Sequence, residues 1–298
     1  MEIKKAERTQ LKLRLALMGP SGSGKTYSAL ALGSGLGKKI LLVDTENHSS
    51  STYADEFGFD VINIDPPYTV DKYLMAMRMG VAQKYDVIVL DSISHEWAGE
   101  GGLLEQKNAM DAKGGNQWTN WAKPTKEHEK FKSAILTVDA HLIATVRSKE
   151  EYVLEANSQG KMVPVKKGMG PVQREGIAFE FGVVFELDMK HVATVTKTRL
   201  KFLDGKEFVP SEEIGKSLKE WLETGKVESL PKSKEDEQRE TLALQIEEKV
   251  TSETGGDLSK ADELIGSLTQ GKMKIADLRV YPVSWLEALN SKLMEAKA

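Results

Sequence analysis

The residues in this sequence best suited to chemistry form a short glycine-rich run near the amino terminus. The run comprises Gly19, Pro20, Ser21, Gly22, Ser23, Gly24, Lys25 and Thr26. Its spacing matches G-x-x-x-x-G-K-[S/T], a loop whose backbone N–H groups close around phosphates. In such a loop the Lys25 ammonium reaches the β- and γ-phosphates, and the Thr26 hydroxyl ligates Mg²⁺. The run therefore predicts a site for ATP and Mg²⁺.

Carboxylates that follow two short apolar runs are the next candidates. Asp91 closes one run, and we expect it to join the Mg²⁺ shell. Many P-loop ATPases carry a glutamate directly after this aspartate, but here the position is Ser92. Glu46 lies two residues past the preceding apolar run, and we expect it to act as the general base that activates water. Glu96, five residues past Asp91, is the competing candidate.

Hydrophobic periodicity indicates the elements that must position these residues. Strands are expected at 11–17, 39–44, 61–64, 86–91, 141–147, 183–188 and 192–198, and helices at 26–36, 53–57, 69–83, 124–138 and 216–222. Such alternation predicts an α/β fold with a mainly parallel central sheet flanked by helices. Segments 92–123 and 148–176 are expected to be long loops.

The chain divides into parts of different character. Residues 1–224 are predicted to form the nucleotide-binding core, residues 225–236 a polar linker, and residues 237–298 a small helical carboxyl-terminal region. With 40% hydrophobic and 29% charged residues, the composition is ordinary for a protein with a sizeable core.

Charge and cysteine content exclude several classes of function. The net charge of −4 provides no overall attraction for nucleic acid, so any such contact must come from a local basic patch. The chain has no cysteine, which excludes disulfides, thiolate zinc sites and cysteine nucleophiles. No apolar run approaches the roughly 20 residues that span a membrane, and the first ten residues are polar. A cytoplasmic protein without membrane contact is expected.

The run Asp44-Thr45-Glu46, Tyr53 seven residues after the glutamate, and the segment 87–92 together resemble the RecA recombinase core. This resemblance implies a RecA-like P-loop NTPase fold. It also implies that Glu46 is the catalytic base and that Tyr53 stacks on adenine.

The resemblance extends further along the chain. RecA-like proteins carry a basic pair on a late strand that reaches the ATP of a neighbouring subunit, and Lys197 and Arg199 stand at that place. The similarity thus implies a homo-oligomer, a ring or short filament, with ATP at subunit interfaces. Arg147 falls near the position of a phosphate-sensing polar side chain.

Residues 10–222 also look like the short phage-encoded RecA-like ATPases, classed with the AAA type, that are linked to single-strand annealing and recombination. If the chain is phage-encoded, this resemblance implies action in the cytoplasm of a bacterial host. It also implies a phage single-strand binding protein as a partner.

RecA folds bind single-stranded DNA through two loops, and the second has its positional equivalent at 148–176. Between positions 160 and 174 this segment carries Lys161, Lys166, Lys167 and Arg174 and no acidic residue. Such a patch is the electrostatic footprint expected for a single strand.

These observations favour an ATP-hydrolysing RecA-like protein that acts on single-stranded DNA in phage recombination or annealing. Two alternatives remain open. The chain could be an ATPase that acts on protein partners, as helicase loaders or packaging accessories do, or a small-molecule kinase with segment 148–176 as its lid.

Overall fold

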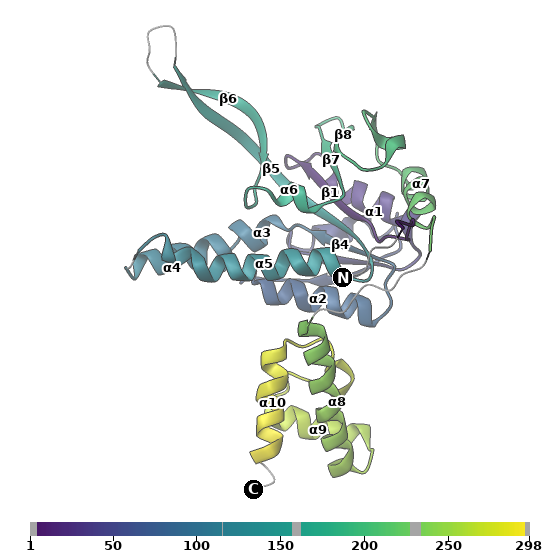
Figure 1. Cartoon of the computed structure of the whole chain (residues 1–298), viewed down its shortest axis with the longest axis vertical. Helices are drawn as coiled ribbons and strands as arrows, with labels where there is room; N and C mark the ends of the chain where they lie inside the picture. The colour runs from purple at the N-terminus through teal and green to yellow at the C-terminus, as the bar shows by residue number, and fades with distance from the viewer. Residues whose placement is uncertain (1–4, 115, 157–161, 227–233, 296–298) are drawn as a thin grey trace. The chain divides into compact units, whose positions relative to one another are not determined.

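The structure is a computed structural model that describes residues 5–114, 116–156, 162–226 and 234–295 (Figure 1). The chain divides into two compact units. The first comprises Met1–Leu74 with Lys84–Glu228, and the second Met75–Gln83 with Ser229–Ala298.

A central sheet organises the first unit. In the described residues its strand order is β3 (Asp60–Asn63), β2 (Ile40–Asp44), β4 (Val87–Asp91), β5 (His141–Ala156), β1 (Arg14–Gly19), β7 (Val183–Leu187), β8 (Ala193–Lys197) and β9 (Glu207–Phe208). Strands β3, β2, β4, β5, β1 and β7 run parallel to one another, whereas β8 pairs antiparallel with β7, and β9 pairs antiparallel with β8. The prediction of a mainly parallel α/β sheet is confirmed.

The middle strands are apolar on both faces because helices cover both sides of the sheet. Every residue of β2 and β4 is buried, as is all of β1 except its first residue. Continuous apolar runs are typical of such doubly covered parallel strands. In register, Asp44 pairs with Asp91 and Gly19 pairs with Arg147. The carboxyl ends of four adjacent strands therefore meet at one edge, where the chemistry-bearing residues lie.

The helices that precede the carboxyl-terminal region are α1 (Lys25–Leu36), α2 (Val70–Ala82), α3 (Ser94–Ala98), α4 (Leu103–Ala112), α5 (Ala122–Thr137), α6 (Ile177–Glu180) and α7 (Glu212–Leu222). Helices α1 and α7 pack closely through Gly35 and Gly215. A Cβ atom on Gly35 would collide with the carbonyl oxygen of Glu212, so only glycine permits this approach. The contact fixes α1, and with it the loop that precedes it.

The two predicted loops are structured, so that expectation was wrong. Segment 92–123 contains α3, α4 and the start of α5. Segment 148–176 contains most of a long antiparallel hairpin in which β5 pairs with β6 (Met162–Pro171), from Ser148 opposite Pro171 to Ala156 opposite Met162. Figure 1 shows this hairpin extending beyond the body of the sheet. The hairpin is held by backbone pairing, which requires no apolar period, so its sequence gives no clear periodic signal.

A smaller correction concerns segment 53–57, predicted as a helix. The structure has a 3₁₀ helix, η1, over Ser49–Tyr53 instead. The shift of four residues matters because it places Tyr53 at the end of the turn.

The second unit contains α8 (Lys234–Thr254), α9 (Leu258–Thr269) and α10 (Val283–Glu295), which agree with the predicted carboxyl-terminal helices. Its own apolar core includes Ile246, Ile265 and Leu286, each fully buried. Asp257 caps α9 by accepting a hydrogen bond from the Ser259 backbone N–H at 3.0 Å. Over the described residues, no helix combines the length and apolar character needed to cross a membrane.

Candidate active site

The glycine-rich run forms the turn between β1 and α1. Gly24 is the residue before the helix and has φ +81°, a left-handed conformation that glycine adopts without steric cost. The backbone N–H groups of the first helical turn have no partner within the helix and point toward the loop. This arrangement provides the anion-binding helix terminus that the motif predicts.

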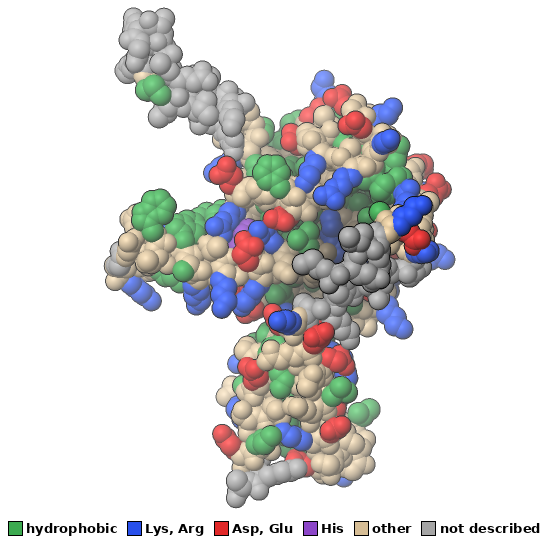
Figure 2. All heavy atoms as spheres, in the orientation of Figure 1, with side chains coloured by type: hydrophobic (Ala, Val, Ile, Leu, Met, Phe, Trp, Pro, Cys, Tyr) green, Lys and Arg blue, Asp and Glu red, His purple; other side chains and the backbone are tan. Residues whose placement is uncertain are grey.

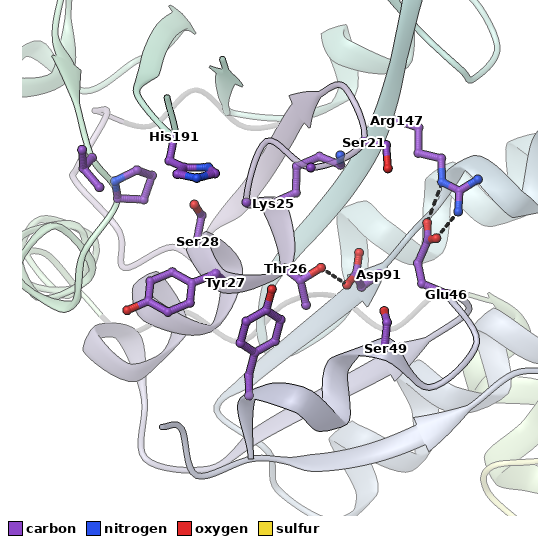
Figure 3. A pocket seen from close by; sticks show the side chains of 15 residues that line it. Ser21, Lys25, Thr26, Tyr27, Ser28, Glu46, Ser49, Asp91, Arg147 and His191 are labelled. Atoms are coloured by element: carbon purple, nitrogen blue, oxygen red, sulfur yellow. Dashed lines mark hydrogen bonds and ion pairs between the residues drawn. The ribbon is translucent and has the colours of Figure 1, made fainter. Parts of the chain in front are cut away.

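A pocket of about 510 Å³ opens beside this loop (Figure 3). Among the sequence-predicted residues, it is lined by Ser21, Gly22, Gly24, Lys25, Thr26, Glu46, Tyr53, Asp91 and Arg147. Gly19, Pro20 and Ser23 belong to the same loop but do not line the pocket. The Ser23 side chain is buried beneath the loop, and its hydroxyl has no hydrogen-bond partner among the residues that the structure describes. The structure therefore brings most of the predicted nucleotide site together.

Lys25 projects over the loop. Its Nζ donates hydrogen bonds to the carbonyl oxygens of Gly19 at 3.0 Å and Pro20 at 2.8 Å. An ammonium has three N–H donors, so one donor is left for a phosphate oxygen. Burial lowers the pKa of Lys25, and the nearby carboxylates of Asp91 and Glu46 oppose that shift.

Thr26 and Asp91 form an oxygen pair suited to Mg²⁺. The Thr26 hydroxyl donates to Asp91 Oδ2 at 2.6 Å, and the Thr145 hydroxyl donates to Asp91 Oδ1. Asp91 is 2% exposed, and burial raises the pKa of its carboxyl group. Mg²⁺ in phosphate sites is held by few protein oxygens together with the phosphates. The residues present therefore fit a Mg²⁺–nucleotide complex.

Glu46 lies in the pocket, on the segment after β2, and forms an ion pair with Arg147 of β5. Arg147 Nε donates to Glu46 Oε1 at 2.7 Å and its Nη2 donates to Oε2, while the Ser92 hydroxyl donates to Oε1 at 3.0 Å. The hydrogen bonds to Glu46 raise the pKa of Arg147. Figure 3 shows this pair beside Asp91. Both oxygens of the candidate base are thus engaged by donors.

Thr45 ties together the two segments that carry Glu46 and Asp91. Its hydroxyl accepts from the Ser92 backbone N–H at 2.8 Å, and its own N–H donates to the Asp91 carbonyl at 2.7 Å. The Asp91–Ser92 peptide bond is cis. These contacts bring the Ser92 hydroxyl to Glu46. Sequence reasoning assigned no role to Thr45 or Ser92, although both flank the predicted carboxylates.

This geometry agrees with the comparison to known families. A family profile described as AAA domain matches residues 11–210, about two thirds of the chain. The chain belongs to the AAA domain family. Membership supports ATP binding and P-loop ATPase activity in general, typically with Mg²⁺. A search of curated proteins found no match.

Within this AAA domain, Glu96 lies away from the pocket. Its side chain is fully buried. Its Oε1 lies 3.3 Å from His128 Nδ1, and its Oε2 accepts from Gln173 Nε2 at 3.1 Å. These partners come from α5 and from the segment after β6. The geometry therefore favours Glu46 over Glu96 as the base, and the assignment stays a prediction.

Tyr53 lines the pocket and meets Tyr27 edge to face, with ring centroids 5.8 Å apart. Sequence reasoning missed six lining residues: Tyr27, Ser28, Ser49, His191, Val209 and Pro210. Tyr27 and Ser28 directly follow the motif, and Ser49 lies between Glu46 and Tyr53, so nearness to predicted residues could have indicated these three. His191, Val209 and Pro210 come from distant segments with no local pattern.

The structure does not bring Lys197 and Arg199 to the pocket of their own AAA domain. Strand β8 is antiparallel, and Lys197 pairs with Val184 at the beginning of β7, whereas the pocket lies beyond the end of β7. Lys197 Nζ donates to the Phe179 carbonyl at 2.7 Å. Arg199 is exposed. A role for this pair in a neighbouring subunit remains a prediction.

The residues predicted to contact DNA fall in different surroundings. Lys161 lies outside the described residues, and Lys166 and Lys167 lie on β6 of the hairpin. The Arg174 guanidinium lies about 6 Å from the ring centroids of Trp97 and Trp121, which stack on each other. Arg174, three residues past β6, therefore packs against these two tryptophans and does not lie on the hairpin with Lys166 and Lys167.

Proposed function

We propose that this chain is a RecA-like ATPase in which Glu46 is the general base. In this proposal, single-stranded DNA bound at the β5–β6 hairpin moves Arg147 away from Glu46 and so frees the base. One observation carries the proposal. Glu46 faces the phosphate loop across the pocket while Arg147, from the strand that becomes the hairpin, occupies both of its carboxylate oxygens.

Each pocket residue has a chemical task in this proposal. Lys25 and the backbone N–H groups of the loop bind phosphate oxygens, and Thr26 and Asp91 hold Mg²⁺, which neutralises phosphate charge. Glu46 accepts a proton from the attacking water. It does so only after the hydrogen bonds from Arg147 are broken, because those donors occupy both of the oxygens that could receive the proton.

The β5–β6 hairpin connects the proposed DNA site to Arg147. Arg147 is the last residue of β5 paired with β1, and the next residue, Ser148, begins the pairing with β6. The Arg147 carbonyl accepts from the Val172 N–H at 2.6 Å, so both strands of the hairpin are attached at this point. A strand of DNA held by Lys161, Lys166 and Lys167 would reposition the hairpin base and draw Arg147 from Glu46.

The proposal extends to recombination or annealing, supported by the resemblance to phage-encoded RecA-like ATPases. A homo-oligomer would place Lys197 and Arg199 against the nucleotide of a neighbour, and a phage single-strand binding protein would be a partner. Mixing Arg199→Ala with Glu46→Gln subunits tests the assembly. Partial rescue of hydrolysis requires a junction with both residues intact, and no rescue in demonstrably mixed oligomers would contradict it.

The experiment that tests the function measures ATP hydrolysis with and without single-stranded DNA, with electron microscopy of the same samples. We expect DNA to raise the rate several-fold. The double variant Lys166→Ala, Lys167→Ala should keep the DNA-free rate and lose the stimulation, because it removes phosphate contacts alone. Hydrolysis indifferent to DNA would instead favour an ATPase that acts on protein partners. Phosphate transfer to a small acceptor without hydrolysis would favour a kinase.

A further inference from the structure

The turn between β7 and β8, residues 188–192, lies against the phosphate loop. A Cβ atom on Gly24 would lie 2.9 Å from His191 Nδ1, and one on Gly22 would lie 3.4 Å from Met189 Cε. The turn therefore covers the two central glycines of the loop. Nothing in the glycine-rich motif indicates this neighbour, because it is more than 160 residues away in the sequence.

Asp188 holds this turn in shape. Its Oδ1 accepts hydrogen bonds from the backbone N–H groups of Lys190 at 2.8 Å and Val192 at 2.9 Å. The His191 N–H donates to the Asp188 carbonyl at 3.1 Å. His191 itself has φ +65°, a left-handed conformation that is uncommon outside glycine and asparagine. The backbone contacts thus fix the place from which the imidazole projects.

The imidazole lines the nucleotide pocket at the end remote from the candidate base. Figure 3 shows His191 on the same side as Tyr27 and Ser28, with Glu46 and Arg147 on the opposite side. Val209 and Pro210 also contribute to the lining. Lys25, Thr26 and Asp91 mark the phosphate end. A nucleotide whose terminal phosphates face Glu46 therefore directs its nucleoside toward His191.

We propose that His191 binds the nucleoside part of ATP, its ribose and base, within the same chain. An imidazole can exchange a hydrogen bond with a ribose hydroxyl or a base edge, and its ring offers a flat apolar face. Asp188 is a positioning residue for it. This inference rests on the proposed function only in that the pocket binds ATP.

The test compares the dissociation constants of three Mg²⁺-bound ligands: ATP, ADP and inorganic tripolyphosphate. In His191→Asn, which keeps the left-handed backbone while shortening the side chain, we expect ATP and ADP to bind about tenfold more weakly. Tripolyphosphate should bind as it does to the wild type, since it has no nucleoside. Lys190→Ala is the matched control in the same turn, because Lys190 does not line the pocket, and it should change none of the three.

Two results would overturn the assignment. One is unchanged affinity for all three ligands in both His191→Asn and His191→Gly. The other is an equal loss for tripolyphosphate, which would make His191 a phosphate ligand. Thermal unfolding of each variant checks that the fold is retained. If the wild-type protein bound no ATP, the proposed function would fail together with this inference, whereas wild-type binding with unaffected variants would overturn the inference alone.

Discussion

Glu46 and Glu96 are two carboxylates that come after neighbouring parallel strands, yet they lie in contrasting surroundings. Figure 3 shows Glu46 at the pocket, and Figure 2 shows other acidic side chains interspersed with basic ones over the visible surface. The Glu46 side chain is 20% exposed, lines the pocket and contacts Arg147 and Ser92. The Glu96 side chain is fully buried against His128 and Gln173. One carboxylate can exchange its partners for water and ligand, whereas the other is part of the core.

The difference arises from the path of the backbone after each strand. After β2 the chain turns sharply, and Asp44 accepts a hydrogen bond from the Glu46 N–H at 2.6 Å, which directs Glu46 along the edge of the sheet. After β4 the chain enters α3 at Ser94, and Glu96 is carried beneath α5. The number of residues from a strand end therefore does not decide whether a carboxylate reaches the site. The backbone conformation of the residues after the strand decides it.

The largest expected effect is on ATP binding, which should depend on the pocket that contains Glu46 and not on the buried cluster around Glu96. Lys25→Ala should weaken ATP binding by on the order of 100-fold or more, because it removes a charged donor from buried phosphates. Gln173→Ala, which removes a partner of Glu96, should leave the ATP dissociation constant within about twofold. Isothermal titration with Mg²⁺–ATP measures both. Comparable losses in the two variants would erase the distinction.

The second expected effect is on the free energy of unfolding. Here the buried Glu96 should matter more than the pocket residue Glu46. Glu96→Ala should lower the free energy of unfolding by roughly 2–4 kcal/mol, since it leaves the buried His128 without its carboxylate and removes one acceptor of Gln173. Glu46→Ala should cost less than about 1 kcal/mol, because its ion pair is partly exposed. Chemical denaturation of both variants provides the comparison. A larger loss in Glu46→Ala would show that the Arg147 contact is structural.

The smallest expected effect sharpens the role of Arg147. Arg147→Ala should retain ATP binding but reduce the ratio of DNA-stimulated to basal hydrolysis from several-fold to about one, because the contact that DNA would break is then absent in both states. Lys132→Ala, on α5, is a control that should keep the wild-type ratio. Steady-state hydrolysis over a DNA titration measures the ratio, and undiminished stimulation in Arg147→Ala would rule out coupling through this contact.

Much of the sheet and the phosphate loop could be predicted because their signals are local. The G-x-x-x-x-G-K-T spacing and the apolar runs of β2 and β4 each lie within a few consecutive residues. The position of Glu46 and Asp91 at one sheet edge could also be predicted, since the carboxyl ends of parallel strands meet at the same edge.

Other features depend on contacts between distant segments. The hairpin of β5 and β6 is held by backbone pairing between Ser148–Ala156 and Met162–Pro171 rather than by an apolar period. His191 reaches the loop because β7 lies beside β1, and Arg147 reaches Glu46 because β5 and β2 flank β4. These neighbours are set by strand order, which residue periodicity does not specify.

The most direct test of Glu46 as the base measures ATP hydrolysis and ATP binding in Glu46→Gln and Glu96→Gln side by side. Removing a general base typically costs about 10²–10⁴-fold in rate, so Glu46→Gln should bind ATP normally and hydrolyse it at least about 100-fold more slowly. Glu96→Gln should hydrolyse ATP within a few-fold of the wild-type rate. Loss of hydrolysis in folded Glu96→Gln with activity retained in Glu46→Gln would contradict the assignment.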